Sequence, residues 1–440
     1  MKKQEFKLGN PLAISYQLRY TTLMLKKGKT FAVYTFGCRL NQAESQLIKE
    51  KLLVEGLKET VISQADWVII NSCVVTQKAQ KEVGQFVRRI RRENSNCQLW
   101  LVGCFADLKR IDHQLSDLPV DRWLTNKEKR AWLKGFLVPT SFKSQGRGLV
   151  KIQEGCQHFC SYCLVPYLRG KSVSLPADFV LNNVRRLVER GTKWVVLTGV
   201  EVIHYQDHNL DFLSLVEKIL KQTSVKLISF GSISPLIGNG VERLIRLYQK
   251  FPQRLARHLH LSLQSGSNKI LKLMNRGYSA QEYLSLAERL KKSIAGLNLT
   301  TDIIVGFPGE TKEDFQETLA LVKKIGFGKI HIFRFSPRPR TLAEKKAGQW
   351  GVVDEKTKKQ RANQLAKLEK KLRLKFWRSL LGTEATALAF EKFGPKVASG
   401  QTDNFVPVLI KPIKRKNLGR LLKIRFEKID GKHISAFQVN

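Results

Sequence analysis

Long hydrophobic runs are missing from this sequence. No stretch approaches the roughly 18 consecutive apolar residues that a membrane-spanning helix needs. Arg19 interrupts the only apolar section among the first 29 residues, so this section does not look like the core of a secretory signal. These two absences argue against a membrane protein or a secreted one. We therefore expect a cytoplasmic protein.

Acidic residues are also scarce. The chain has 37 Asp and Glu against 77 Lys and Arg, which gives a formal net charge of +40 that is spread over nearly the whole length. Such a surplus predicts a polyanionic partner, with RNA or DNA as the first choice. The composition alone is also compatible with a lysine-rich surface whose charge is only solvated, and with attraction to an anionic membrane surface.

Cysteines are few, and their number is odd. Seven cysteines in 440 residues without a secretory signal argue against a disulfide framework. They favour thiolates that are kept reduced for metal binding or catalysis. Their positions decide between these uses.

The first third of the chain alternates strand-like and helix-like segments. Residues 31–36, 67–70 and 99–102 are rich in β-forming residues, and residues 44–55 and 77–92 between them are amphipathic. This βαβ rhythm predicts a parallel sheet. We expect a three-layer α/β domain over residues 30–143, preceded by a basic extension over residues 1–29.

The same rhythm restarts after a Gly/Ser/Gln patch at residues 144–148 that resembles a linker. The predicted strands are residues 149–153, 194–198, 226–230, 260–263, 301–305 and 330–335. Spacings of roughly 30 to 45 residues fit one strand and one helix per unit. The sequence thus predicts a partial (β/α)6 barrel over residues 144–375.

The last part of the chain contains a basic helical segment and then several short β-like segments. Residues 354–381 predict a helix rich in Lys and Arg with one apolar stripe, which is either solvated or in contact with RNA. Short β-like pieces follow at residues 384–390, 405–410, 421–426 and 434–439. They predict a small β-barrel over residues 376–440 with a basic loop at residues 411–420.

Three cysteines stand close together after the first barrel strand. Cys156, Cys160 and Cys163 have CxxxCxxC spacing, so three soft ligands share one loop. They can hold a 4Fe–4S cluster with one iron left open, and an open iron is where S-adenosylmethionine can chelate. The alternative is zinc, for which His158 would be the fourth ligand.

Three further cysteines each follow a predicted strand of the first domain. Cys38, Cys73 and Cys104 should meet at the carboxyl edge of the parallel sheet, which predicts a second metal site. The alternative is that each is a small buried side chain. Cys97 precedes its strand, about 20 Å from Cys104 in extended chain, so we do not expect it to be a ligand.

These features carry a resemblance to known families. The triplet, the six-fold β/α pattern and Tyr162 look like the radical S-adenosylmethionine (SAM) superfamily, in which reductive cleavage of SAM yields a 5′-deoxyadenosyl radical. Residues 30–440 resemble the methylthiotransferases through TFGCRLNQAES, NSCVVT, GCQHFCSYCLVPYLRG, HLHLSLQSGS, MNRGY and DIIVGFPGET. The stretch GQTDNFVPV resembles the RNA-binding TRAM module.

The resemblance implies two 4Fe–4S clusters, SAM, a tRNA substrate, a reductant such as a flavodoxin or ferredoxin, and a sulfur donor. TFGCRLNQAES and NSCVVTQKA look most like the branch that methylthiolates C2 of N6-threonylcarbamoyladenosine beside the anticodon. The isopentenyladenosine branch and the ribosomal-protein aspartate branch are alternatives. A non-catalytic tRNA-binding iron–sulfur protein is a more distant one.

The resemblance also implies SAM contacts around the barrel rim. The candidates are Tyr162, Thr198, Gly199, Glu201, Ser262 and Gln264. A strand-ending turn is the plain alternative for residues 198–201. The sequence departs from the family, which usually has Asn at the position of Glu201, an acidic residue at Ser234 and Gly at Arg340.

Overall fold

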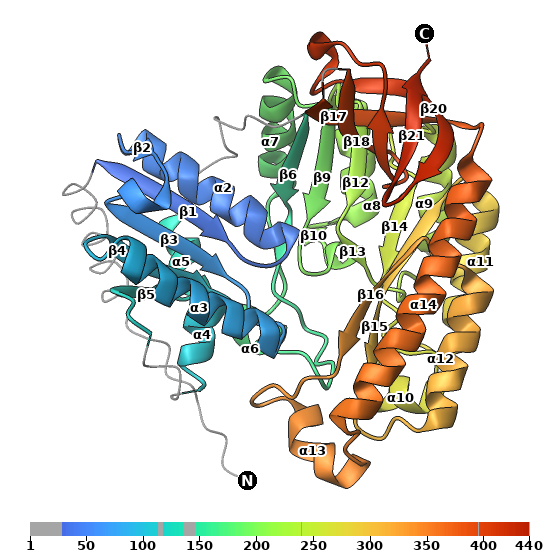
Figure 1. The fold of residues 1–440 in the computed structure, drawn as a ribbon, viewed down its shortest axis with the longest axis horizontal. Coiled ribbons are helices and arrows are strands. Elements are labelled where there is room, and N and C mark those ends of the chain that lie inside the picture. Colours follow the sequence, from blue (N-terminus) through green and yellow to red (C-terminus); the bar gives the residue numbers. More distant parts are fainter. Residues whose placement is uncertain (1–28, 113–117, 135–145, 239, 395, 440) are drawn as a thin grey trace. The chain divides into compact units, whose positions relative to one another are not determined.

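The computed structural model describes residues 29–112, 118–134, 146–238, 240–394 and 396–439 (Figure 1). The chain divides into two compact units, Met1–Ser141 and Phe142–Asn440. Apart from Lys29, the predicted basic extension lies outside the described residues. No helix in the described ranges combines the length and apolar character needed to cross a membrane.

The first unit is built on a five-stranded parallel sheet with the order β2-β1-β3-β4-β5. Its strands are β1 Thr30–Thr35, β2 Lys58–Glu59, β3 Trp67–Ser72, β4 Gln98–Gly103 and β5 Arg122–Leu124. Its helices are α2 Arg39–Val54, η2 Ile62–Gln64, α3 Gln77–Glu93, α4 Cys104–Lys109 and α5 Asn126–Trp132.

Both faces of this sheet are covered, which confirms the predicted three-layer arrangement. The central strands β3 and β4 are almost entirely buried, as expected for parallel strands between two helical layers. Ile48 of α2 and Trp132 of α5 share one core with Phe31 of β1. On the other face, Phe86 of α3 packs against Tyr34 with a ring separation of 4.2 Å.

The second unit contains the predicted partial barrel of parallel strands. In spatial order its strands are β6 Arg147–Lys151, β9 Trp194–Thr198, β12 Leu227–Phe230 with β13 Ser232–Ile233, β14 His258–Leu261, β15 Asn298–Val305 and β16 Lys329–Arg334. The outer helices are α7 Ala177–Glu189, α8 Phe212–Gln222, α9 Gly240–Lys250, α11 Ala280–Ser293 and α12 Lys312–Ile325.

Smaller elements connect these strands and helices. They are β7 Gln153–Glu154, α6 Val165–Arg169, β8 Val173–Ser174, η4 Val202–His204, β10 Gln206–Asp207, β11 Leu210–Asp211, α10 Asn268–Leu273 and α13 Leu342–Trp350. The three-stranded and four-stranded parts of the barrel sheet meet at Gly231, between β12 and β13.

All six predicted barrel strands exist; β9 has the predicted ends, and the other five have ends that are shifted by one to three residues. The largest shift is at β15, which starts at Asn298 instead of residue 301. Polar Asn298 does not look like a strand residue, but it is buried and its amide donates to the carbonyl of Asn404 at 2.8 Å. The predicted linker at residues 144–148 is partly wrong, because Arg147 and Gly148 belong to β6.

The C-terminal strands form the predicted small closed barrel. They are β17 Glu384–Gly394, β18 Val397–Thr402, β19 Pro407–Ile410, β20 Leu421–Asp430 and β21 His433–Gln438, with η5 Arg415–Asn417 in the basic loop. Strand β18 is absent from the sequence prediction. Its Gly400 weakens the β signal, yet a Cβ atom there would lie 2.8 Å from the carbonyl oxygen of Leu388, so the strand pairing needs glycine.

A single long helix, α14 Glu355–Leu380, runs beside β16 and α12 and leads into this small barrel (Figure 1). Trp377 at its end joins the small barrel's core. The small barrel is also fixed to the amino ends of β14 and β15. Arg257 pairs with Asp403 at 2.7 Å, and Phe405 stacks on His258 with a ring separation of 3.9 Å. The carboxyl ends of the six strands lie at the opposite end of the sheet.

Candidate functional site

The structure puts Cys38, Cys73 and Cys104 at the carboxyl ends of three adjacent parallel strands, as the sequence predicts. Cys38 is the residue before α2, Cys73 follows β3 directly, and Cys104 is the first residue of α4. Gly37 allows the first two to approach, because a Cβ atom at this position would lie 2.4 Å from Cβ of Cys73. Its φ of +102° also favours glycine.

Side chains beside the cysteines lock the three strand-end loops together. Asn41 donates to the carbonyl of Phe36 at 2.8 Å and to the carbonyl of Ser72 at 2.9 Å, which joins the loops of Cys38 and Cys73. The hydroxyl of Ser72 donates to the carbonyl of Val102 and accepts from the backbone N–H of Phe105, which joins the loops of Cys73 and Cys104. The three thiols are thus held on one rigid edge.

A buried ion pair lies next to this edge. The Lys129 side chain is 1% exposed, and its Nζ lies 2.5 Å from Oε2 of Glu44 and 3.3 Å from Oδ1 of Asn71. Asn71 in turn donates to the carbonyl of Asn41, so the ion pair supports the residues that join the loops. Asn126 donates toward Sγ of Cys104 at 3.6 Å. Hydrogen-bond donors to sulfur are typical of iron–sulfur ligands.

The barrel cysteines lie on the loop between β7 and α6. Backbone N–H groups reach two of the sulfurs: His158 donates to Cys156 and Val165 to Cys163, both at 3.4 Å. Burial, with a smaller contribution from the neighbouring Cys160, raises the pKa of the Cys156 thiol to about 11 and that of Cys163 to about 12. Protonated thiols are therefore favoured until a metal displaces the protons. Three thiols on one loop, two of them with amide donors, fit a 4Fe–4S cluster.

Arg276 brings a positive charge into hydrogen-bond contact with this cysteine loop. Its Nη1 lies 3.1 Å from Sγ of Cys160, and its Nε donates to the hydroxyl oxygen of Tyr278 at 2.9 Å. The same guanidinium reaches the carbonyl of Ser262 at 3.3 Å, and the Tyr278 hydroxyl donates to that carbonyl at 2.8 Å. Arg276 therefore connects the cysteine loop to the end of β14.

Gln153 makes the corresponding connection to the end of β9. Its side-chain oxygen accepts from the backbone N–H of Val200 at 3.0 Å and of Glu201 at 3.1 Å. Its side-chain nitrogen donates to the carbonyl of Gly155, the residue before Cys156, at 2.7 Å. A Cβ atom at Gly199 would lie 2.8 Å from the same Gln153 oxygen, so glycine is needed here.

The predicted SAM contacts are distributed around these two connections. Thr198 ends β9 and is buried, and Oε2 of Glu201 lies 3.7 Å from Sγ of Cys156. Tyr162 packs against the apolar cluster around Phe307 and Phe335, and burial raises its pKa well above the usual value.

The remaining two candidates follow β14. The Ser262 hydroxyl lies 3.3 Å from Asp302. Gln264 forms a β-bridge with Ile303 of β15, and its φ is +72°.

Two of the positions at which the sequence departs from the family can be described as follows. Ser234 is buried, and Arg340 has a φ of +69°, a conformation that favours the family's glycine. The roles of these residues toward SAM stay predictions.

Several supporting residues are not among the sequence candidates. Asn41, Ser72 and Arg276 lie inside the motifs TFGCRLNQAES, NSCVVT and MNRGY, so their position in a family motif could have identified them as candidates. Lys129 and Gln153 lie outside all of the family motifs named above. Nothing in a single sequence marks them as partners of the cysteine loops.

Two known protein families match this chain, one over the N-terminal domain and one over the partial barrel. The radical SAM superfamily matches residues 150–322. A family described as Uncharacterized protein family UPF0004 matches residues 30–124, the part that holds Cys38, Cys73 and Cys104. Among solved structures, a radical S-adenosylmethionine methyltransferase from Kitasatospora setae is similar to this chain with a TM-score of 0.53 and 12% identity, covering 73% of this chain and 76% of its own. This likeness concerns the fold.

Curated relatives cover almost the whole chain. A threonylcarbamoyladenosine tRNA methylthiotransferase of Chlamydia pneumoniae is 34% identical over 91% of this chain and 96% of its own length. A tRNA-2-methylthio-N(6)-dimethylallyladenosine synthase of Endomicrobium trichonymphae is 32% identical over 82% of this chain and 88% of its own. With its radical SAM barrel, which brings SAM and 4Fe–4S chemistry, the chain belongs to the radical SAM methylthiotransferase family.

Proposed function

We propose that this enzyme inserts a methylthio group at C2 of N6-threonylcarbamoyladenosine beside the anticodon of tRNA. The observation that carries the proposal is the pair of three-cysteine sets, each held at the carboxyl edge of its own parallel sheet. A binding protein has no need for two such sets, which argues for catalysis. The match to a relative named for this nucleoside supports the substrate. A cytoplasmic location follows from a tRNA substrate.

In this proposal Cys156, Cys160 and Cys163 hold the cluster that binds SAM. When bound, this cluster and SAM supply an electron and a carbon radical that removes hydrogen from an unactivated C–H bond. Arg276 balances the negative charge of the ligated Cys160 from 3.1 Å. Gln153 fixes the backbone at residues 199–201, where we place the amino acid end of SAM, relative to the cluster loop.

Cys38, Cys73 and Cys104 would hold a second cluster, at which the incoming sulfur docks. Asn126 suits this role, because its amide near Cys104 stabilises an anionic cluster. The ion pair of Lys129 and Glu44 supports the edge that carries the three cysteines. The sulfur donor and the reductant, such as a flavodoxin or ferredoxin, are partners that this chemistry requires. The proposed division of labour keeps the predicted domains at residues 30–143, 144–375 and 376–440.

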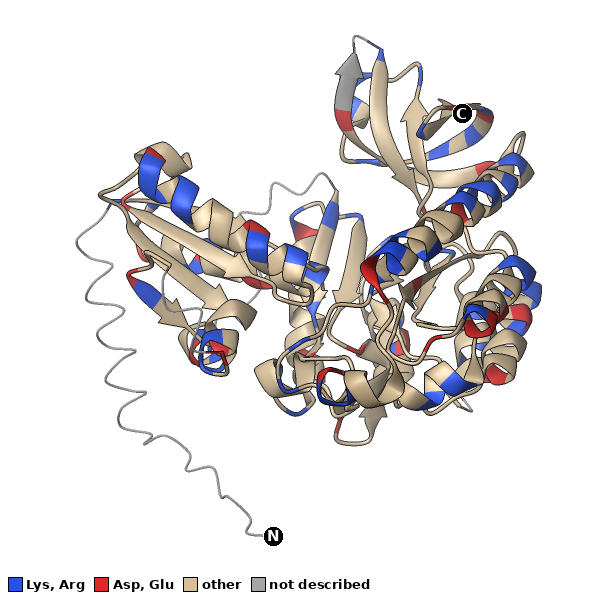
Figure 2. Ribbon diagram, turned by 60° about the horizontal axis from the view of Figure 1, so that its bottom comes forward, with Lys and Arg blue, Asp and Glu red and all other residues tan. Residues whose placement is uncertain are grey.

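Two basic surfaces of the second unit suit tRNA. Figure 2 shows Lys and Arg side by side along the helix that leads into the C-terminal barrel. The exposed basic residues of this helix, α14, are Lys356, Lys359, Lys367, Lys370, Lys371, Lys375 and Arg378. The solvent side of strand β20 adds Lys423 and Arg425, although both pair with Glu384. Phosphate contacts of this kind give affinity without base specificity.

The second candidate substrate is isopentenyladenosine in tRNA. Its support is the 32% identity to a relative named for dimethylallyladenosine, close to the 34% of the threonylcarbamoyladenosine relative. An aspartate of a ribosomal protein and a non-catalytic iron–sulfur protein are further alternatives, and both predict tRNA without a methylthio group.

The test is nucleoside mass spectrometry of tRNA from a bacterial host that lacks both of its own tRNA methylthiotransferases. Expression of the wild-type chain should produce the methylthio form of threonylcarbamoyladenosine. A Cys160→Ala variant, expressed to the same level, should not. Methylthiolation of isopentenyladenosine alone would support the second substrate. If the strain that expresses iron-loaded wild-type protein contains neither methylthio nucleoside, a tRNA substrate is contradicted.

A further inference from the structure

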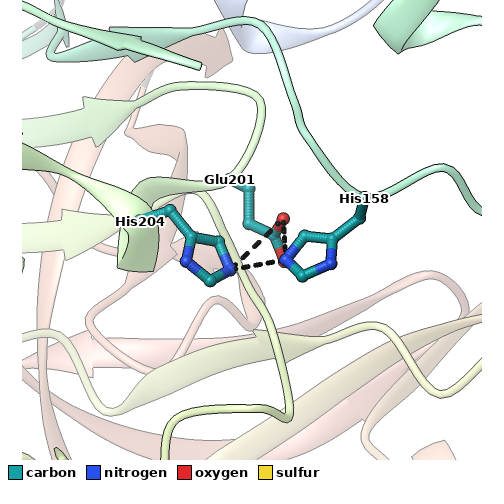
Figure 3. A group of neighbouring side chains, drawn as sticks. All are labelled: His158, Glu201 and His204. Atoms are coloured by element: carbon teal, nitrogen blue, oxygen red, sulfur yellow. Dashed lines mark hydrogen bonds and ion pairs between the residues drawn. The ribbon is translucent and has the colours of Figure 1, made fainter. Parts of the chain in front are cut away.

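Two histidines and a glutamate converge at the loop that carries Cys156, Cys160 and Cys163. His158 lies between Cys156 and Cys160, and Glu201 and His204 belong to the turn after β9. Figure 3 shows the two imidazole rings and the carboxylate pointing toward one another. The Nε2 atoms of the histidines are 2.8 Å apart, and Oε2 of Glu201 lies 3.5 Å from His158 and 3.6 Å from His204.

The three atoms that face one another, Nε2 of His158, Nε2 of His204 and Oε2 of Glu201, can each give a lone pair to a metal ion. In the cluster-free protein the Cys156 thiol also donates toward Oε2 of Glu201, at 3.7 Å. Once Cys156 is a cluster ligand that donor is gone, so the need for a positive charge increases.

We propose that His158, Glu201 and His204 form a binding site for one divalent first-row transition metal ion, separate from both clusters. Two imidazole nitrogens and one carboxylate are a donor set that zinc and ferrous iron accept. The ligand atoms all lie within 4.8 Å of one another. Tetrahedral zinc with nitrogen bonds of about 2.0 to 2.1 Å requires the two Nε2 atoms to be about 3.3 Å apart. The rings need to separate by only about 0.5 Å from their present contact.

The surroundings suit an ion that stays in contact with solvent or substrate. The histidine side chains are 38% and 39% exposed, whereas Glu201 is 15% exposed. Three protein ligands leave at least one coordination position for water or an anionic group. The ion would also join the cluster loop to the turn after β9, because His158 comes from the first and the other two ligands from the second.

This site differs from zinc bound by the cysteine triplet with His158. In that case sulfur atoms would surround the metal, and the cluster would be absent. The proposed ion has no sulfur ligand, and the cluster is in place beside it. The site rests on the proposed function in that Cys156 belongs to a cluster, and it gives the Glu201 carboxylate to the ion while the backbone of residues 199–201 faces the amino acid end of SAM.

The experiment uses the full-length protein, reconstituted without oxygen to about eight irons and desalted. Zn²⁺ is then titrated in competition with a chromophoric chelator, and bound zinc and iron are measured by mass spectrometry. The wild type should bind one zinc per chain. His204→Ala should weaken this binding by about tenfold or more, since it removes a ligand. His208→Asn is the matched control: His208 is 95% exposed on the same segment, and asparagine tolerates its φ of +49°.

Zinc K-edge absorption of the wild-type sample gives a second measurement that does not depend on a variant folding well. It should show nitrogen and oxygen neighbours at about 2.0 to 2.1 Å with imidazole scattering and no sulfur at about 2.3 Å. Equal zinc binding by His204→Ala, no bound zinc in the wild type, or a sulfur shell would each overturn the proposal. Failure of the cluster assignment would be visible separately, as iron well below eight atoms.

Discussion

The guanidinium of Arg276 lies 3.1 Å from Sγ of Cys160, the middle cysteine of the barrel triplet. Arg276 is held there by the Tyr278 hydroxyl and by the carbonyl of Ser262. A fixed positive charge next to a cluster ligand stabilises the reduced state, which carries one more negative charge. The contact therefore bears on how easily the barrel cluster accepts an electron.

Replacing Arg276 by methionine should lower the reduction potential of the barrel cluster. The expected shift is about 60 mV, which corresponds to about 1.4 kcal/mol for one electron and to the loss of one charge-assisted hydrogen bond. The measurement is a potentiometric titration followed by electron paramagnetic resonance, in a background where Cys38, Cys73 and Cys104 are alanine. Lys272→Met on α10 is the control, because Lys272 is exposed and its replacement removes the same charge. An identical shift in both variants would mean that the contact with Cys160 is unimportant.

Asp314 at the start of α12 predicts a pH-dependent stability. Burial alone would raise the pKa of this carboxyl, but hydrogen bonds from Lys269, Thr311 and Ser267 lower the pKa to about 2. Because the folded pKa lies below the ordinary value of 3.8, the stabilisation is complete above about pH 4 and disappears as the pH falls through about 2.

Asp314→Asn should accordingly unfold at lower denaturant concentration than the wild type at pH 7, and the difference should shrink between pH 4 and pH 2. Chemical denaturation at several pH values measures it. Glu317→Gln, on the exposed face of the same helix, is the control and should change stability little. A difference that stayed constant down to pH 2 would show that these hydrogen bonds do not depend on the charge of Asp314.

The positions of the cysteines could be predicted from the sequence, but their support could not. Apolar runs that end in cysteine identify strand ends locally, and parallel strands bring these ends together. The pair of Lys129 and Glu44 joins residues that are 85 positions apart. Such a pair depends on the directions in which two helices on the same face of the sheet point their side chains. A local sequence pattern does not predict these directions.

The contacts of the C-terminal barrel are a second feature that could not be predicted from the sequence. Its sequence looks like an appended module, so its removal would be expected to leave the catalytic barrel intact. In the structure Asp403 pairs with Arg257, and Phe405 covers Trp194 and His258. Truncation would expose these aromatic rings and leave a partly buried arginine without its carboxylate. Substitutions on the surface are therefore the cleaner test of RNA binding.

Changing Lys367, Lys370 and Lys371 of α14 to glutamine should weaken tRNA binding. If each contacts one phosphate, the slope of log affinity against log salt concentration should flatten by about 2 to 3, at about 0.7 to 0.9 per contact. Filter binding at several salt concentrations measures this. The same three positions changed to arginine keep the charge and should keep the slope. Unchanged affinity and slope in the glutamine variant would exclude α14 from the tRNA interface.

Cys97 tests the orientation of the first sheet. It lies before β4 and therefore at the end of the strand opposite Cys104, and Arg91 covers it with a hydrogen bond to its carbonyl at 2.7 Å. Cys97→Ala should keep about eight irons and full activity. Because Cys97 is 3% exposed, the substitution should cost roughly 1 kcal/mol of stability. Loss of four irons would mean that Cys97 is a ligand, which the strand direction does not allow.

The two cysteine sets should separate by function when each is removed. With Cys38, Cys73 and Cys104 all changed to alanine, the barrel cluster should remain at about four irons. Its ligands are all on one loop, and the residues that hold the loop, Arg276 and Gln153, belong to the second unit. Reductive cleavage of SAM, measured as 5′-deoxyadenosine formed with dithionite, should therefore continue.

Methylthiolation should nevertheless vanish in this triple variant, because no iron remains where the sulfur would dock. The matched variant with Cys156, Cys160 and Cys163 changed to alanine should lose both SAM cleavage and methylthiolation, since no electron can then reach the sulfonium. Methylthiolated tRNA from the first variant would mean that Cys38, Cys73 and Cys104 are core residues and that sulfur arrives elsewhere. Loss of SAM cleavage in the first variant, with a normal circular dichroism spectrum and four irons still bound, would mean that the barrel cluster needs the N-terminal one to react.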